Sequence, residues 1–83
     1  MGDDADTGMS ELSIKLENYL ERLVPTMGMH ILQRQCEILH IDPDNIQKKD
    51  LLRLSDMLAK AVEMFVGYDE SRMIRLNILQ NKF

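Results

Sequence analysis

The sequence predicts an all-α fold, a compact four-helix bundle-like domain preceded by a disordered acidic tail. Apolar residues recur at helical spacing in four segments, and no segment shows a sustained alternation of apolar and polar residues. Proline, glycine and aspartate separate these segments. With 83 residues, the chain has room for one domain with a single modest core. We therefore expect a disordered tail at 1–9 and one helical domain at 10–83.

The first helix is predicted over about 10–24. Residues 1–8 contain three aspartates, two glycines and no large apolar residue after Met1, which is typical of a disordered tail. Ser10 is a good N-cap, and Glu11 follows in the first turn. Ile14 stands alone on the opposite face, and Pro25 ends the helix. One apolar stripe faces inward, made of Leu12, Leu16, Tyr19, Leu20 and Leu23.

The second helix, over about 26–40, carries two apolar stripes and is therefore expected to lie between two neighbouring helices. Gly28 lies beside the first stripe, where a missing side chain would permit a close helix crossing. The first stripe contains Met29, Leu32, Cys36 and Leu39, and the second contains Met27, Ile31 and Ile38.

The remaining two helices follow a clear loop signal at 41–46, where Asp42, Pro43 and Asp44 supply turn residues. A helix is predicted from a start within 47–50 to about residue 66, where Gly67 is placed to end it in a left-handed conformation. Asp69 is then expected to cap a last helix over about 70–81.

These last two helices carry more apolar surface than a monomer of this size needs. The apolar residues of 51–66 spread over roughly 240° of the helix, whereas a surface helix needs a stripe of about 100°. In the last helix, Met73, Ile74, Leu76, Ile78, Leu79 and Phe83 point in nearly every direction. Burying apolar surface contributes about 25 cal/mol per Å², so we expect a homodimer formed through these helices.

We expect a non-catalytic protein-interaction or regulatory module, with a second copy and another protein as partners. The link at 67–69 is a candidate hinge for exchange of the last helix between protomers. The predicted interface residues are Leu76, Ile78, Leu79 and Phe83, with Ile14 and Ile31 as outlying candidates.

The charge of the chain argues against nucleic acid as its main partner. The net charge is −4 and the pI is about 5.0, whereas phosphate binding needs a basic field. The one basic cluster joins Lys48, Lys49 and Arg53 and is typical of a solvated helix start. DNA-associated regulation by an acidic dimer stays open as an alternative.

The single cysteine allows no intrachain disulfide, which argues against a small secreted scaffold. The acidic N-terminus is unlike a secretion signal, and no apolar run is long enough to cross a membrane. We therefore expect a cytoplasmic location and no membrane partner.

Met29, Cys36 and His40 form a second alternative, a soft-metal site. They lie on one side of the second helix, and thioether, thiolate and imidazole ligands suit Cu(I). The same residues are also ordinary packing residues. A calcium loop starting at Asp42 fails on ligand spacing, because its twelfth position is Arg53. No phosphate loop or nucleophile motif is present, so we expect no enzyme activity and no cofactor.

Overall fold

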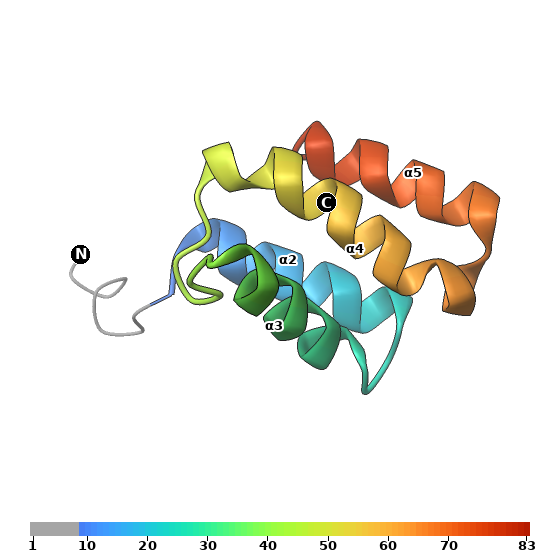
Figure 1. The fold of residues 1–83 in the computed structure, drawn as a ribbon, viewed down its shortest axis with the longest axis horizontal. Helices are drawn as coiled ribbons and strands as arrows, with labels where there is room; N and C mark the ends of the chain where they lie inside the picture. The colour runs from blue at the N-terminus through green and yellow to red at the C-terminus, as the bar shows by residue number, and fades with distance from the viewer. Residues whose placement is uncertain (1–8) are drawn as a thin grey trace.

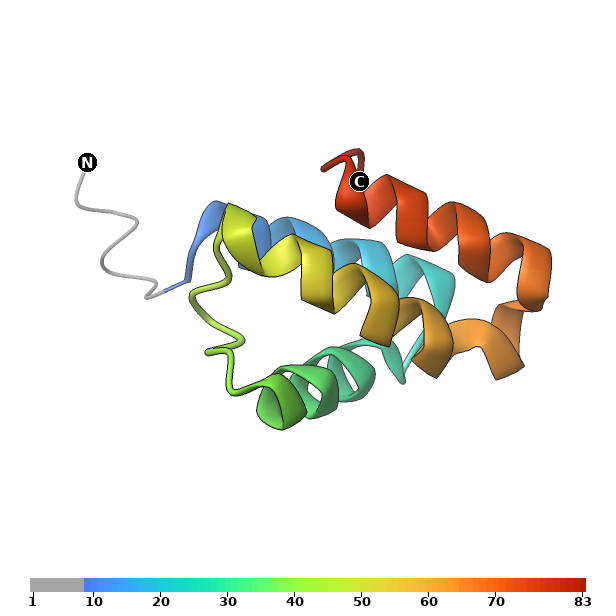
Figure 2. The same cartoon turned by 45° about the horizontal axis from the view of Figure 1, so that its top comes forward.

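The computed structural model describes residues 9–83, and this part of the chain confirms the all-α prediction. Successive helices run in opposite directions and form two hairpins, α2–α3 and α4–α5, packed on each other (Figures 1 and 2). The predicted tail at 1–9 lies, except for Met9, outside the described residues. The elements are α2 (Glu11–Leu23), α3 (Gly28–Leu39), the 3-10 turn η1 (Lys48–Asp50), α4 (Leu51–Val66) and α5 (Tyr68–Leu79).

Helix α2 begins where the sequence predicts because Ser10 caps it. The Ser10 hydroxyl oxygen accepts a hydrogen bond from the amide of Ser13 at 3.1 Å. The amide of Ser10 donates to the carbonyl of Asp44 at 2.8 Å, and the buried hydroxyl of Ser13 accepts from the amide of Ile46 at 2.8 Å. The two serines therefore cap α2 and also hold the 41–47 loop, which follows α3 in the chain, against the start of α2.

Helix α3 crosses α2 at Gly28, as the sequence predicts. A Cβ atom built on Gly28 would lie 2.5 Å from the carbonyl carbon and oxygen of Leu20 and 2.6 Å from the amide nitrogen of Glu21. Only a hydrogen atom fits between these two backbones. The Glu21 carboxylate also accepts a hydrogen bond from the amide of Met29 at 2.8 Å, so α2 supplies a cap for the N-terminus of α3.

Both ends of α3 are set by residues with a positive φ angle. The helix begins at Gly28, two residues later than predicted, because Thr26 in the preceding turn has φ 69°. It ends at Leu39, where His40 adopts the left-handed conformation at φ 59°. Histidine is among the residues that tolerate this region best. The amide of His40 donates to the carbonyls of Cys36 and Glu37, which closes the last turn.

The start of the third predicted helix is a 3-10 turn that continues directly into α4. Gln47 and Asp50 form a capping box, in which the backbone amide of Gln47 donates to the Asp50 carboxylate at 2.9 Å. Asp50 is buried, and its carboxylate oxygen Oδ1 also lies 3.9 Å from the guanidinium nitrogen Nη2 of Arg53. The predicted start within 47–50 is confirmed.

The hairpin of α4 and α5 turns on a single residue, Gly67, at φ 92°. The prediction that Asp69 caps the last helix is wrong, because α5 already begins at Tyr68 and Asp69 lies in its first turn. The expected three-residue hinge is therefore one residue long. Helix α5 ends at Leu79, before the predicted residue 81, because Asn81 has φ 58° and turns the chain.

The core lies between the two hairpins and includes residues from all four helices and from the 41–47 loop. Helix α3 contacts both α2 and α4, as its two stripes predict. Of the second stripe, however, only Ile31 is buried, whereas Met27 and Ile38 are exposed. The fully buried large side chains are Leu16, Leu20, Leu32, Ile46, Leu54, Leu58, Val62, Ile74 and Ile78.

Candidate association surface on α4 and α5

Exposed apolar side chains are concentrated on the second hairpin. Eleven large hydrophobic residues are exposed in the described part of the chain, and seven of them belong to α4 and α5. Single exposed hydrophobic residues are common on soluble proteins, but groups of them mark interaction surfaces. The seven are Leu52, Met64, Phe65, Tyr68, Met73, Leu76 and Leu79.

Three of these residues lie at the end where α4 meets α5, which we term the hairpin end: Met64, Phe65 and Tyr68. The α4–α5 hairpin extends past the α2–α3 turn at this end (Figures 1 and 2). Phe65 lies on the same side of α4 as the buried Leu58 and yet remains 51% exposed, because the first hairpin ends before it. The core-facing side of α4 is therefore uncovered at the hairpin end.

A second group forms the α5 outer face, defined by Met73, Leu76 and Leu79. Ile74 and Ile78 on the opposite side of the helix are buried in the core, so the outer face points away from the other helices. Leu52, which is 66% exposed, lies at the start of α4, at the same end of the hairpin as Leu79. Met73, Leu76 and Leu79 together give the outer side of α5 an apolar surface of three large side chains.

The structure divides the six predicted interface residues into three classes: exposed, buried and partly buried. Leu76, Leu79 and Ile14 are exposed, although Ile14 stands alone on α2. Ile78 is completely buried in the core and has no surface to offer a partner, and Ile31 is buried except for an edge that is 8% exposed.

Phe83, the sixth predicted interface residue, is partly buried. Its ring packs against Tyr19 at 5.7 Å between ring centroids, and the ammonium group of Lys15 lies 5.8 Å from its centroid. Phe83 therefore fixes the C-terminus on α2 and shows only part of its ring to solvent.

Five further exposed apolar residues of this hairpin are not among the predicted interface residues: Leu52, Met64, Phe65, Tyr68 and Met73. Helical spacing alone does not distinguish them from core residues. Four of them, Leu52, Met64, Phe65 and Tyr68, lie in the first or last turn of α4 or α5, and this nearness to a helix end is the available signal. Met73 lies in the middle of α5, on its outer side, where no such signal is present.

The predicted metal ligands do not form an open site. Cys36 is completely buried, whereas Met29 and His40 are exposed. Burial, together with the nearby carboxylates of Asp50 and Asp42, raises the pKa of the Cys36 thiol to about 11. A protonated thiol is a poor metal ligand, and Met29 lies about 10 Å from Cys36 along the helix axis. The described residues contain no group of three histidine, cysteine, aspartate or glutamate side chains placed to hold a metal.

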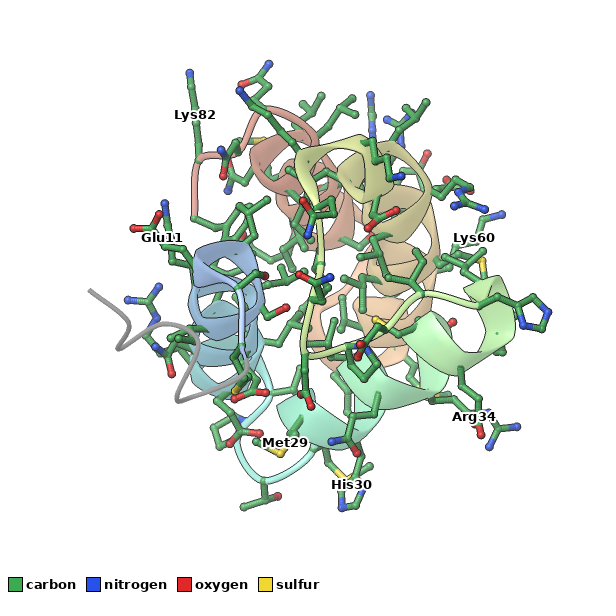
Figure 3. All side chains as sticks on the ribbon, turned by 90° about the vertical axis from the view of Figure 1, so that its left-hand side faces the viewer. Glu11, Met29, His30, Arg34, Lys60 and Lys82 are labelled. Carbon is green, nitrogen blue, oxygen red and sulfur yellow. The ribbon has the colours of Figure 1, made fainter. Side chains whose placement is uncertain are left out.

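A shallow hollow lies along the exposed side of α3 and is lined in part by Met27, Ile31 and Ala61. Figure 3 shows Arg34 of α3 and Lys60 of α4 projecting on the same side of the molecule. Lys60 pairs with Asp56 at 3.6 Å, and Glu37 joins Arg34 in the lining of the hollow. Its polar groups are therefore exposed and mixed in sign, without the converging buried groups of a ligand or catalytic pocket.

The basic cluster predicted at the start of α4 is a solvated helix start. Lys48 and Lys49 are exposed in η1, and Arg53 lies beside the carboxylate of Asp50. The Asp50 carboxylate therefore balances part of the positive charge of this basic cluster.

Comparisons of the chain with protein family models, with curated proteins and with solved structures found no match. Among the described residues, no helix combines the length and apolar character needed to cross a membrane.

Proposed function

We propose that this chain is a non-catalytic protein-interaction module, whose working form is a homodimer built through the apolar surface of α4 and α5. The observation that carries the proposal is the concentration of exposed hydrophobic side chains on that hairpin. The first hairpin and its turn expose four large hydrophobic residues, Ile14, Met27, Met29 and Ile38, against seven on α4 and α5. The surplus is therefore greatest on the second hairpin.

The physical driving force is removal of apolar surface from water. Each Å² of apolar area that pairing covers contributes about 25 cal/mol before the cost of association. A twofold arrangement places the same surface on both copies, so the assembly closes at two. Leu76 and Leu79, which the sequence assigns to the interface, lie at its centre in this proposal, with Met73 beside them.

A regulatory role follows from the same features. The dimer would present two copies of the hairpin end and of the hollow along α3 to another protein, and methionine side chains such as Met64 adapt to different partners at low cost. A cytoplasmic location is part of the proposal, because the single cysteine is an unpaired buried thiol.

The proposal is tested by comparing Leu76→Asp with Ile14→Asp by sedimentation equilibrium. Both wild-type residues are 40% exposed, and both substitutions add one negative charge. Leu76→Asp is expected to give a monomer at concentrations where the wild-type chain is a dimer, whereas Ile14→Asp is expected to remain a dimer. Circular dichroism confirms that both variants fold. A folded Leu76→Asp variant that still forms a dimer would place the interface elsewhere.

A further inference from the structure

The distribution of charge along α5 carries information about how two copies would meet. Acidic residues occupy the first turn of the helix, at Asp69 and Glu70. No acidic residue follows between 71 and 83, where the charged residues are Arg72, Arg75 and Lys82. The helix therefore has an acidic beginning and a basic end.

Two of the three cations already have partners within the protomer. Arg75 lies 3.7 Å from the carboxylate of Asp56, and the guanidinium of Arg72 lies over the ring of Tyr68 at 5.8 Å from its centroid. Among the described residues, Asp69 and Lys82 are exposed and take part in no ion pair within the protomer. Glu70 is likewise exposed and in no ion pair within the described residues, but Asp69, seven residues before Leu76, lies on the same side of α5 as the outer face. Asp69 and Lys82 therefore offer charges of opposite sign near the two ends of α5.

The position of Lys82 is fixed, although it follows the end of the helix. Its amide donates to the carbonyl of Asn77 at 2.7 Å, and the amide of Asn81 donates to the carbonyl of Ile78 at 3.0 Å. This turn holds Lys82 beside the last turn of α5, and Figure 3 shows its side chain projecting away from the molecule.

We propose that two copies of this chain pair along α5 in antiparallel orientation, with Asp69 of each copy beside Lys82 of its partner. The inference rests on the proposed function, because it requires the α5 outer face to be the dimer interface. Leu76 lies about midway in sequence between Asp69 and Lys82, so a twofold axis that matches these two charges passes close to Leu76. The most central apolar residue of the outer face then meets its own equivalent.

The parallel alternative is electrostatically unfavourable. It would bring Asp69 beside Asp69 of the partner and Lys82 beside Lys82 of the partner, and it would align the two helix dipoles. Antiparallel pairing instead forms two opposite-charge contacts at the rim of an apolar centre. Rim contacts of this kind contribute more to orientation than to total affinity.

Charge exchange tests the orientation. Asp69→Lys and Lys82→Asp are each expected to weaken self-association about tenfold at low salt, because each substitution replaces two attractions by two repulsions. The double variant, with both Asp69→Lys and Lys82→Asp, again places opposite charges beside each other. Its dissociation constant is expected to lie within about twofold of the wild-type value. Glu37→Lys and Arg34→Asp make the same charge changes on α3 and serve as controls, with no expected effect on the dimer.

Cysteine cross-linking gives an independent geometric test, since the native Cys36 is buried. Leu76→Cys alone is expected to form a disulfide-linked dimer, as is a mixture of Asp69→Cys and Lys82→Cys chains. Asp69→Cys alone is expected not to cross-link. The antiparallel orientation would be overturned if the single charge-exchange variants had the wild-type dissociation constant. It would also be overturned if Asp69→Cys chains cross-linked efficiently with one another. Either result would leave the proposed function standing. A wild-type monomer would overturn both.

Discussion

Gly28 of α3 lies against the backbone of Leu20 in α2 so closely that a Cβ atom would approach the Leu20 carbonyl to 2.5 Å. The contact is between main chains, which cannot move aside as a flexible side chain can. It fixes the crossing of the first hairpin, on which the core residues of both helices depend.

Gly28→Ala is therefore expected to destabilise the fold by about 1–3 kcal/mol, the usual cost of overpacking. Helix propensity alone predicts the opposite sign, since alanine is favoured over glycine in a helix by about 1 kcal/mol. Urea denaturation of the variant and the wild type measures the difference. An unchanged or increased free energy of unfolding would show that α2 and α3 do not cross in this way.

The hydroxyl of Ser13 gives a second test of the packing. Ser13→Ala removes the acceptor for the buried Ile46 amide, and an unpaired buried amide costs about 1–3 kcal/mol. Ser55→Ala is the matched control, because Ser55 is equally buried but donates only to the Leu52 carbonyl of its own helix. We expect a loss of less than about 1 kcal/mol for the control. Equal effects of both substitutions in urea denaturation would contradict the role of Ser13 in holding the loop.

Glu17 makes the stability dependent on pH. Burial, and then the charges of Asp44 and Glu21, raise the pKa of this carboxyl group above its ordinary value. The folded chain therefore holds the proton more tightly than the unfolded chain, so this group's contribution to stability is full at acidic pH and is lost as pH rises through the raised pKa.

Glu17→Gln is accordingly expected to raise the melting temperature at pH 7, and to have little effect on it below about pH 4, where both states are protonated. Glu63→Gln, at an exposed position of α4, is the control. A Glu17→Gln variant that melts at or below the wild-type temperature at pH 7 would contradict the raised pKa of Glu17 in the folded chain.

Cys36 is expected to resist modification in the folded protein. Its thiol is buried, and its pKa is raised to about 11, so the reactive thiolate is scarce at pH 8. A thiol reagent should react at the slow rate of unfolding and rapidly in denaturant. Because the unfolded thiol ionises at about pH 8.5, stability should also fall as pH rises from about 8.5 towards the folded pKa. Rapid labelling in native buffer would contradict the burial of Cys36.

Local chemistry made much of this fold predictable from the sequence. Ser10, Pro25 and Gly67 mark helix boundaries through capping, a missing donor and a positive φ angle, all of which act within a few residues. Gly28 was predictable because a glycine beside an apolar stripe has few other roles. The error at Asp69 arose because Gly67 ends one helix and begins the next, which left no turn for an aspartate cap.

The assignment of surfaces was less predictable because it depends on how whole helices pack. Helix α5 has apolar residues on nearly every side, so spacing alone did not distinguish the buried Ile78 from the exposed Leu79. The exposure of Phe65 depends on the first hairpin being shorter than the second, a relationship between helices distant in sequence. The surplus of apolar surface and the two helices that carry it were visible in the sequence, but the identity of the exposed residues required the packed structure.

The most direct test of the account is the mass of the wild-type chain in solution, measured by light scattering on a sizing column over a wide range of dilution. We predict about twice the 9.7 kDa of one chain, falling towards one chain only on strong dilution. A mass of one chain at the highest concentrations would contradict the homodimer and with it the assignment of the α4–α5 surface to self-association.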